Sequence, residues 1–233
     1  MISRGREGYG GRLRLVALFL LLSGTFLGFA PTIVGERHLV PDPLWAQSGQ
    51  EIRNGFLVSS LGKSTVEVKC VAKDELLEFL NSHSQDPVLF EPVPPLFGGM
   101  TSFLVEVTNS SDVPMVLVGQ HAIFQDDEGD KLYSMGFPDL YLILSDDRRQ
   151  DEKMQVLGGL LFSSTPVATG NSRKGLLVFE GLPDPAAKRA TLSISFLHAG
   201  RALKTEEYAF PFAIEALPPD EGGGIAGEKD TEK

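Results

Sequence analysis

The sequence predicts a mainly β protein, an antiparallel β-sandwich with short helical insertions. About seven short runs of apolar or alternating residues are separated by turn-forming residues and joined mostly without helices, which is typical of two antiparallel sheets packed face to face. The 233 residues, 42% of them hydrophobic, are sufficient for one domain with its own core. We expect this domain over residues 64–215, after a lead-in at 47–63.

The first predicted elements are a strand and a helix. Residues 65–71 alternate between polar and apolar side chains, as a half-buried strand does. Cys70 shares the apolar face of this strand and is expected to be buried as a small hydrophobic residue. Residues 73–80 change to a helical period with acidic side chains in the first turn. The Pro- and Gly-rich residues 84–99 predict a loop.

The middle of the chain predicts further strands joined by polar turns. Residues 102–108 alternate, and Asn109–Asp112 has the composition of a turn. Residues 113–124 are mostly apolar and predict one or two strands. An acidic turn at 126–130 and a short strand at 131–133 complete a predicted hairpin.

Residues 137–162 depart from the strand pattern and predict a helical insertion, either two short helices or one interrupted helix. Four apolar residues have the spacing i, i+3, i+4 and i+7 of one helical face: Phe137, Leu140, Tyr141 and Leu144. This face is more apolar than a solvated connection requires. It is therefore either a partner surface or a cap on the sandwich core.

The last third of the chain predicts three strands and a tail. Residues 175–179 form a short apolar strand, and residues 190–197 alternate cleanly. Residues 208–214 form the returning strand, and because Pro211 cannot donate a backbone hydrogen bond, this strand is expected at a sheet edge. The composition of residues 216–233 predicts a disordered tail.

Residues 1–46 predict an export segment. A basic cluster precedes residues 15–34, which are free of charge, and secretion machinery reads such a pattern with the positive end kept inside. The segment is either a signal peptide cleaved after Ala46 or a retained anchor, since twenty helical residues span about 30 Å, the thickness of a bilayer core. Both alternatives place residues 47–233 in the periplasmic or extracellular space.

The charge of the chain limits its partners. The net charge is −10, and because residues 1–46 carry two more basic than acidic side chains, the remainder carries −12. A nucleic-acid binder would need a basic patch, so no nucleic acid is expected. Membrane contact is expected only through the N-terminal segment, if it is not cleaved. The single Cys excludes an internal disulfide framework and a multi-Cys zinc site.

Four runs of the chain resemble a recurring pattern of bacterial exported domains. They are the strand and turn at 103–114, the hairpin at 124–133, and the late strands at 174–179 and 192–196. Over roughly residues 101–214 the chain resembles the immunoglobulin-like sandwiches grouped with the DUF4352 and telokin-like families. The resemblance implies an immunoglobulin-like fold and export, and the family has no catalytic motif to transfer. The helices predicted at 73–80 and 137–162 depart from the family pattern.

No set of reactive side chains converges in the sequence. The four His residues are dispersed, and no nucleophile or phosphate-binding motif has its required spacing. We therefore expect no cofactor, no metal and no catalytic residue. One alternative is a calcium-dependent ligand or adhesion module that uses Asp126, Asp127 and Asp130, although a solvated hairpin turn explains the same cluster. A second alternative is a hydrolase whose site assembles in space.

The expected function is that of an exported, non-enzymatic sandwich which binds or supports another envelope or extracellular protein. The sequence does not name that partner. The residues expected to contact it are those of the helical face: Phe137, Leu140, Tyr141 and Leu144.

Overall fold

The computed structural model describes residues 37–46, 49–91, 99–162, 166–200 and 203–216. The apolar segment 15–34 and the tail predicted beyond residue 216 lie outside the described residues. Contacts divide the chain into Met1–Ile33 and Val34–Lys233, and all described residues belong to the second unit. None of the helices in the described ranges is long and apolar enough to cross a bilayer.

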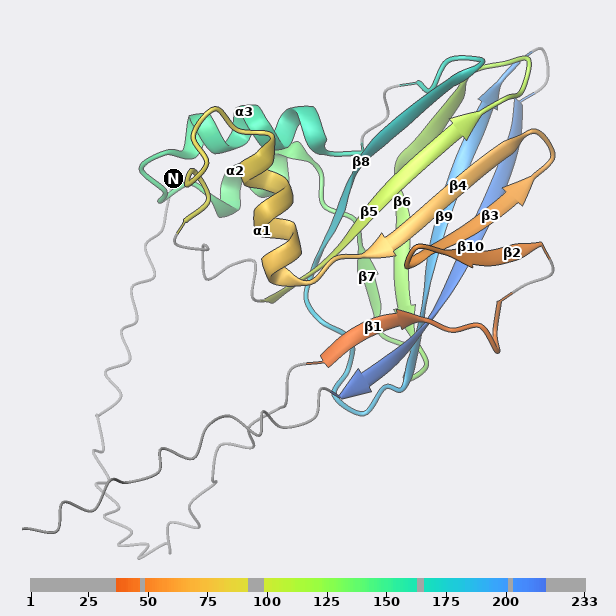
Figure 1. Cartoon of the computed structure of the whole chain (residues 1–233), viewed down its shortest axis with the longest axis horizontal. Coiled ribbons are helices and arrows are strands. Elements are labelled where there is room, and N and C mark those ends of the chain that lie inside the picture. The colour runs from red at the N-terminus through yellow and green to blue at the C-terminus, as the bar shows by residue number, and fades with distance from the viewer. Residues whose placement is uncertain (1–36, 47–48, 92–98, 163–165, 201–202, 217–233) are drawn as a thin grey trace, which may run out of the picture. The chain divides into compact units, whose positions relative to one another are not determined.

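The described residues form two antiparallel sheets of five strands each, and their facing sides enclose the main core (Figure 1). Sheet 1 has the strand order β1 (Arg37–Pro41), β10 (Leu203–Ala216), β9 (Arg189–Ala199), β6 (Met115–Asp126) and β7 (Lys131–Tyr133). Sheet 2 has the order β2 (Gln50–Arg53), β3 (Phe56–Leu61), β4 (Ser64–Cys70), β5 (Met100–Asn109) and β8 (Asn171–Glu180). The predicted fold class is thus confirmed as a mainly β structure of two antiparallel sheets.

Alternating strands bury their apolar faces between the sheets. In β9, Leu192 and Ile194 belong to this core, whereas Ser193 between them is only partly buried. Phe103 of β5 has its ring centroid 5.3 Å from that of Phe124 in sheet 1, and such tilted ring pairs add to the free energy of apolar burial. Cys70, which was expected to be buried, is partly buried and packs against this core, and desolvation raises the pKa of its thiol to about 12.

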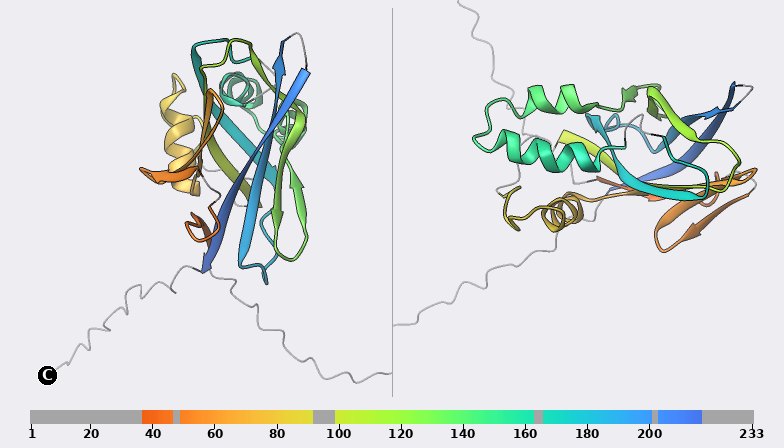
Figure 2. Two further views of the ribbon diagram at one scale, coloured as in Figure 1. Left: turned by 90° about the vertical axis from the view of Figure 1, so that its right-hand side faces the viewer. Right: turned by 90° about the horizontal axis from the view of Figure 1, so that it is seen from above.

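Three helices lie at the β8 edge of sheet 2 and pack against outward-facing side chains of β5 and β8 (Figure 2). They are α1 (Lys73–Ser82), α2 (Phe137–Ile143) and α3 (Gln150–Leu160), and we call them the helical module. A second core lies beneath them and includes Leu104 of β5 and Leu176 and Val178 of β8. Because β8 is buried on both faces, its run 175–179 is apolar throughout instead of alternating.

Both helical predictions are confirmed, the second in its two-helix form. After α3 the chain crosses β8, where the Phe162 N–H donates to the carbonyl oxygen of Leu176 at 2.7 Å. Gly175 permits this crossing, since a Cβ on it would lie 2.7 Å from the carbonyl oxygen of Leu160. The helical module is therefore joined to sheet 2 through the backbone as well as through side chains.

The sandwich begins earlier in the chain than predicted. Strand β1 lies inside the segment 1–46, and all five of its residues pair with the end of β10. Strands β2 and β3 form within the expected lead-in 47–63. A cut after Ala46 would remove β1 from sheet 1, and strands β1, β2 and β3 all precede the predicted start of the domain at residue 64.

Strand β10 is not the edge strand that Pro211 predicted. It pairs with β9 on one side, and its last five residues pair with β1 on the other. Pairing with β1 ends at Phe212, and the Pro211 carbonyl accepts a hydrogen bond from the Asp42 N–H at 3.1 Å. The missing N–H of Pro211 thus faces the side on which β1 has already ended, and it costs no ladder hydrogen bond.

Candidate functional site

The face predicted as a partner surface is divided between core and solvent. Leu140 and Leu144 are only 1% and 3% exposed and belong to the second core, so they cap it and are closed to a partner. Phe137 and Tyr141 are 46% and 45% exposed. Leu142 is 70% exposed, and the helical spacing missed it because it lies off the apolar face. We call Phe137, Tyr141 and Leu142 the α2 ridge.

Contacts on its inner side hold the α2 ridge in place. A Cβ on Gly158 of α3 would lie 3.0 Å from the Phe137 ring, so the ring packs directly on the glycine. The side-chain amide of Gln150 donates to the Tyr141 carbonyl at 2.7 Å and ties the start of α3 to α2. The ridge is therefore exposed at its outer surface and supported from below.

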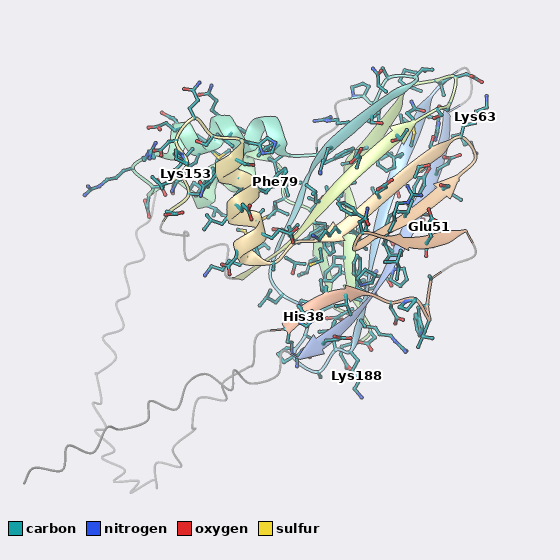
Figure 3. All side chains as sticks on the ribbon, viewed as in Figure 1. His38, Glu51, Lys63, Phe79, Lys153 and Lys188 are labelled. Carbon is teal, nitrogen blue, oxygen red and sulfur yellow. The ribbon has the colours of Figure 1, made fainter. Side chains whose placement is uncertain are left out.

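Ion pairs fasten the helical module to the loop after α1. Arg149 contacts the carboxylate of Asp86 at 2.6 Å and that of Glu152 at 2.5 Å. Lys153, labelled in Figure 3, is buried and pairs with Asp147. The hydrogen bond from Lys153 is the largest cause that holds the pKa of the Asp147 carboxyl below its usual range. These charges stabilise the fold of the module and leave the ridge itself apolar.

Backbone amides engage the acidic turn that was considered for calcium. Asp126 Oδ1 accepts the N–H groups of Gly129 at 3.0 Å and Asp130 at 2.9 Å, and its Oδ2 accepts that of Asp184 at 2.8 Å. Asp127 accepts two N–H groups at the start of β9. The described ranges hold no group of three or more His, Cys, Asp or Glu side chains arranged for a metal ion. The turn thus organises the β6–β7 hairpin and the β8–β9 connection.

A buried polar cluster lies on the β9–β10 pair. His198 Nε2 is 2.8 Å from Glu206 Oε2, and the Tyr208 hydroxyl donates to the same oxygen at 3.3 Å. Burial opposes the ionisation of Glu206, but hydrogen bonds from Lys204 and His198 outweigh it and hold its pKa below the usual range. Burial also raises the pKa of Tyr208 well above its ordinary value. The Glu206 carboxylate is the centre of this network, with His198, Lys204 and Tyr208 as its hydrogen-bond partners.

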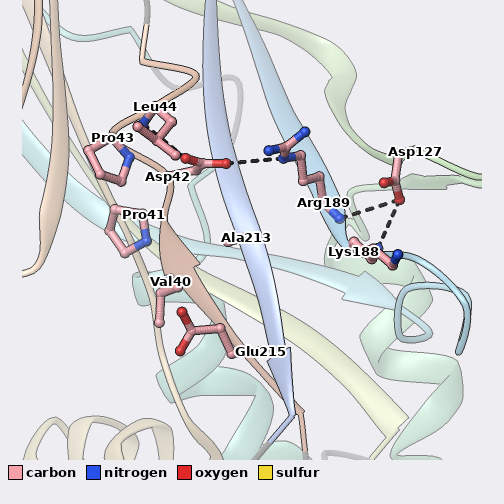
Figure 4. A pocket seen from close by; sticks show the side chains of 10 residues that line it. All are labelled: Val40, Pro41, Asp42, Pro43, Leu44, Asp127, Lys188, Arg189, Ala213 and Glu215. Carbon is pink, nitrogen blue, oxygen red and sulfur yellow. Dashed lines mark hydrogen bonds and ion pairs between the residues drawn. The ribbon is translucent and has the colours of Figure 1, made fainter.

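A pocket of about 480 Å³ lies beside β1 (Figure 4). We call residues 42–46 the β1 turn, and its first three residues, Asp42, Pro43 and Leu44, line one side of the pocket. Asp42 is buried there and pairs with Arg189 at 3.3 Å. The Arg189 guanidinium also lies over the Trp45 ring, 4.4 Å from its centroid. Sequence reasoning missed this region because the β1 turn was interpreted as part of a cleavage site.

Comparisons with known proteins identify no family. No protein-family model matches the chain, and no curated protein matches it. Among solved structures, the chain is similar to a DUF4426 family protein from Pseudomonas aeruginosa, with 11% sequence identity and a TM-score of 0.29. The match covers 74% of this chain and 100% of that chain. A likeness of this strength assigns no function, and the resemblance to the DUF4352 family stays a prediction.

Proposed function

We propose that this chain is an immunoglobulin-like, non-enzymatic domain that acts in the periplasmic or extracellular space and binds a protein partner through the α2 ridge. The observation that carries the proposal is the division of α2 into a buried and an exposed side. Leu140 and Leu144 anchor the helix in the second core. The three residues of the ridge are therefore not needed to fill that core, yet they are held on a rigid support.

The composition of the α2 ridge suits the centre of a protein interface. Adjacent exposed aromatic and leucine side chains are uncommon on a monomer surface and are typical of interface anchors. The stretch that follows α2 exposes charges of both signs, including Asp146, Arg148 and Asp151. The matching partner would therefore be recognised by an apolar pocket and not by a surface of one charge.

The polar clusters elsewhere support a binding role over a catalytic one. The carboxylates of Asp126 and Asp127 hold backbone amides, and Glu206 accepts hydrogen bonds from its neighbours on β9 and β10. These groups stabilise strands and turns. A general acid or base needs an accessible side chain within hydrogen-bond reach of a substrate.

The test compares two matched double variants of the full chain. Tyr141→Glu with Leu142→Glu places charge on the α2 ridge, and Tyr133→Glu with Leu182→Glu places it at other exposed positions with the same residue types. The free energy of unfolding of both variants should lie within about 0.5 kcal/mol of the wild-type value, as is usual for surface substitutions. Photo-crosslinking from position 137 in the native envelope should capture a partner in the wild type and the control, and lose it in the ridge variant.

Two results would contradict the proposal. A ridge variant that keeps the same crosslinked partner would show that the α2 ridge does not bind it. Recovery of the chain in the cytoplasmic fraction of the cell, protected from externally added protease after the outer layers are opened, would contradict the proposed location.

A further inference from the structure

The β1 turn presents two adjacent large apolar side chains to solvent. Leu44 is 86% exposed and Trp45 is 55% exposed. Leu44 is the most exposed of the large hydrophobic residues in the described part of the chain. Apolar surface of this kind is costly in water and commonly marks a contact with another molecule or a membrane.

Hydrogen bonds fix the conformation of the β1 turn. Asp42 Oδ1 accepts the Leu44 N–H at 3.0 Å, and the Asp42 carbonyl accepts the Trp45 N–H at 3.3 Å. The Asp42 N–H donates in turn to Pro211 of β10. Arg189 lies over the Trp45 ring, and its charge is balanced by the buried Asp42 carboxylate. The turn is therefore preorganised, and the cation that touches its indole is already paired.

The position of the N-terminal segment along the chain indicates what covers the turn. The apolar run 15–34 ends two residues before the described chain begins, and at most about 11 Å of extended backbone joins Val34 to Arg37. The Arg37 guanidinium binds the carbonyl oxygens of Asp184 and Pro185 in the β8–β9 connection. That connection leads directly into Arg189, which contacts Trp45. The start of β1 and the β1 turn therefore belong to the same end of the sandwich.

Figure 3 shows His38 of β1 and Lys188 at one end of the sandwich and Lys63 at the other. If residues 15–34 stay in a bilayer, the end with β1 lies within a short tether of the lipid surface. Tryptophan favours the membrane–water interface because its ring is apolar and its N–H can bond with headgroups or water. Transfer of a leucine side chain from water into the acyl region is favourable, because its apolar surface is removed from water.

We propose that the β1 turn is a bilayer-contact site, in which Leu44 and Trp45 enter the interfacial layer of the membrane that holds residues 15–34. This inference rests on the proposed location outside the cytoplasm, but not on the α2 ridge. The lipid surface it fits is zwitterionic, because residues 47–233 carry a charge of −12 and are not attracted to a strongly anionic one. The exposed Lys188 beside the pocket can extend toward lipid phosphate.

The fluorescence of Trp45, which is the single Trp of the chain, provides the test. The full chain is reconstituted through its N-terminal segment into phosphatidylcholine vesicles with or without brominated acyl chains. Trp45 should lose most of its emission in the brominated vesicles. The control combines Trp45→Phe with Leu61→Trp and moves the only Trp to the end of β3, near Lys63, where emission should be retained.

Three outcomes would overturn the bilayer contact. The first is equal emission of Trp45 in both kinds of vesicle while the chain remains vesicle-bound. The second is an emission shift that depends on protein concentration and not on bromine, which would identify a second copy as the covering molecule. The third is a chain from the native envelope whose mass shows that it begins after residue 34. In the variant with Tyr141→Glu and Leu142→Glu, the brominated lipid should quench the Trp45 emission as strongly as in the wild type. A failure of the proposal for the α2 ridge can therefore be distinguished from a failure of the bilayer contact.

Discussion

Replacing Gly175 by alanine tests how firmly the helical module is joined to the sandwich. The added Cβ would lie 2.7 Å from the Leu160 carbonyl oxygen and 3.1 Å from the Phe162 nitrogen. Both are backbone atoms, and the Phe162 N–H is itself bonded to Leu176 on β8 at 2.7 Å. Relief of the clash therefore requires that the end of α3 move away from β8 and weaken this hydrogen bond.

The expected loss of stability is about 2 kcal/mol. Overpacking of a well-packed site costs about 1–3 kcal/mol, and here the rigid neighbours favour the upper part of that range. Gly175 does not have a positive φ, so the alanine recovers roughly 0.5 kcal/mol by restricting the unfolded chain. In a domain of this size, a loss of 2 kcal/mol lowers the Tm by about 4–8 °C.

Gly159→Ala is the matched control for this prediction. Gly159 lies inside α3 and has no atom within 4 Å of the position of an added Cβ. The same glycine-to-alanine change there should stabilise the protein by about 0.5–1 kcal/mol, because alanine has the higher helix propensity. Urea unfolding followed by far-UV circular dichroism measures both variants, with unchanged m-values expected. A Gly175→Ala variant as stable as the wild type would refute the tight junction between α3 and β8.

Further predictions concern the charged clusters and the start of the domain. Asp147→Asn removes the counter-ion of the buried Lys153 and should cost about 1–3 kcal/mol in urea unfolding, less than for a fully buried pair because Asp147 retains solvent contact. Because the pKa values of Asp147 and Glu206 are lowered in the fold, their stabilisation is present above the unfolded pKa and is lost as the pH falls through the folded pKa. Unfolding free energies measured from about pH 7 to pH 3 should therefore decrease, with a shallower slope for Asp147→Asn. Asp126→Ala should lower stability by about 1–3 kcal/mol because three backbone N–H groups lose their acceptor, while calcium and EDTA leave the Tm of the wild type unchanged. A chain that begins after Ala46 should melt below one that begins at residue 35, since it lacks β1; equal melting temperatures would argue against a structural role for that strand.

Strand and helix positions could largely be predicted from the sequence because side-chain periodicity is a local property. The alternation over 190–197 identified β9, and the change of period at 73–80 identified α1. The apolar run 175–179 identified β8, and it also contained a signal that both faces of the strand are buried. Pro211 was a misleading signal, because its effect depends on whether a neighbouring strand continues beside it.

The candidate sites depended on contacts that no local pattern contains. The spacing of four apolar residues predicted one face of α2, but the packing of the helical module on β5 and β8 buried Leu140 and Leu144 and left Phe137 and Tyr141 exposed. Leu142 was missed because it lies off the apolar helical face that the spacing identified.

The sequence by itself determined the fold class, the two-helix insertion and the separation of a basic, apolar N-terminal segment from an acidic remainder. These properties follow from composition and periodicity, which each segment carries alone. Only the tertiary structure decided that β1 belongs to the sandwich, because that strand is stabilised by pairing with β10 at the other end of the chain. It also decided that Trp45 lies on Arg189 in a fixed turn, since the two residues meet only after the β8–β9 connection has folded back to β1.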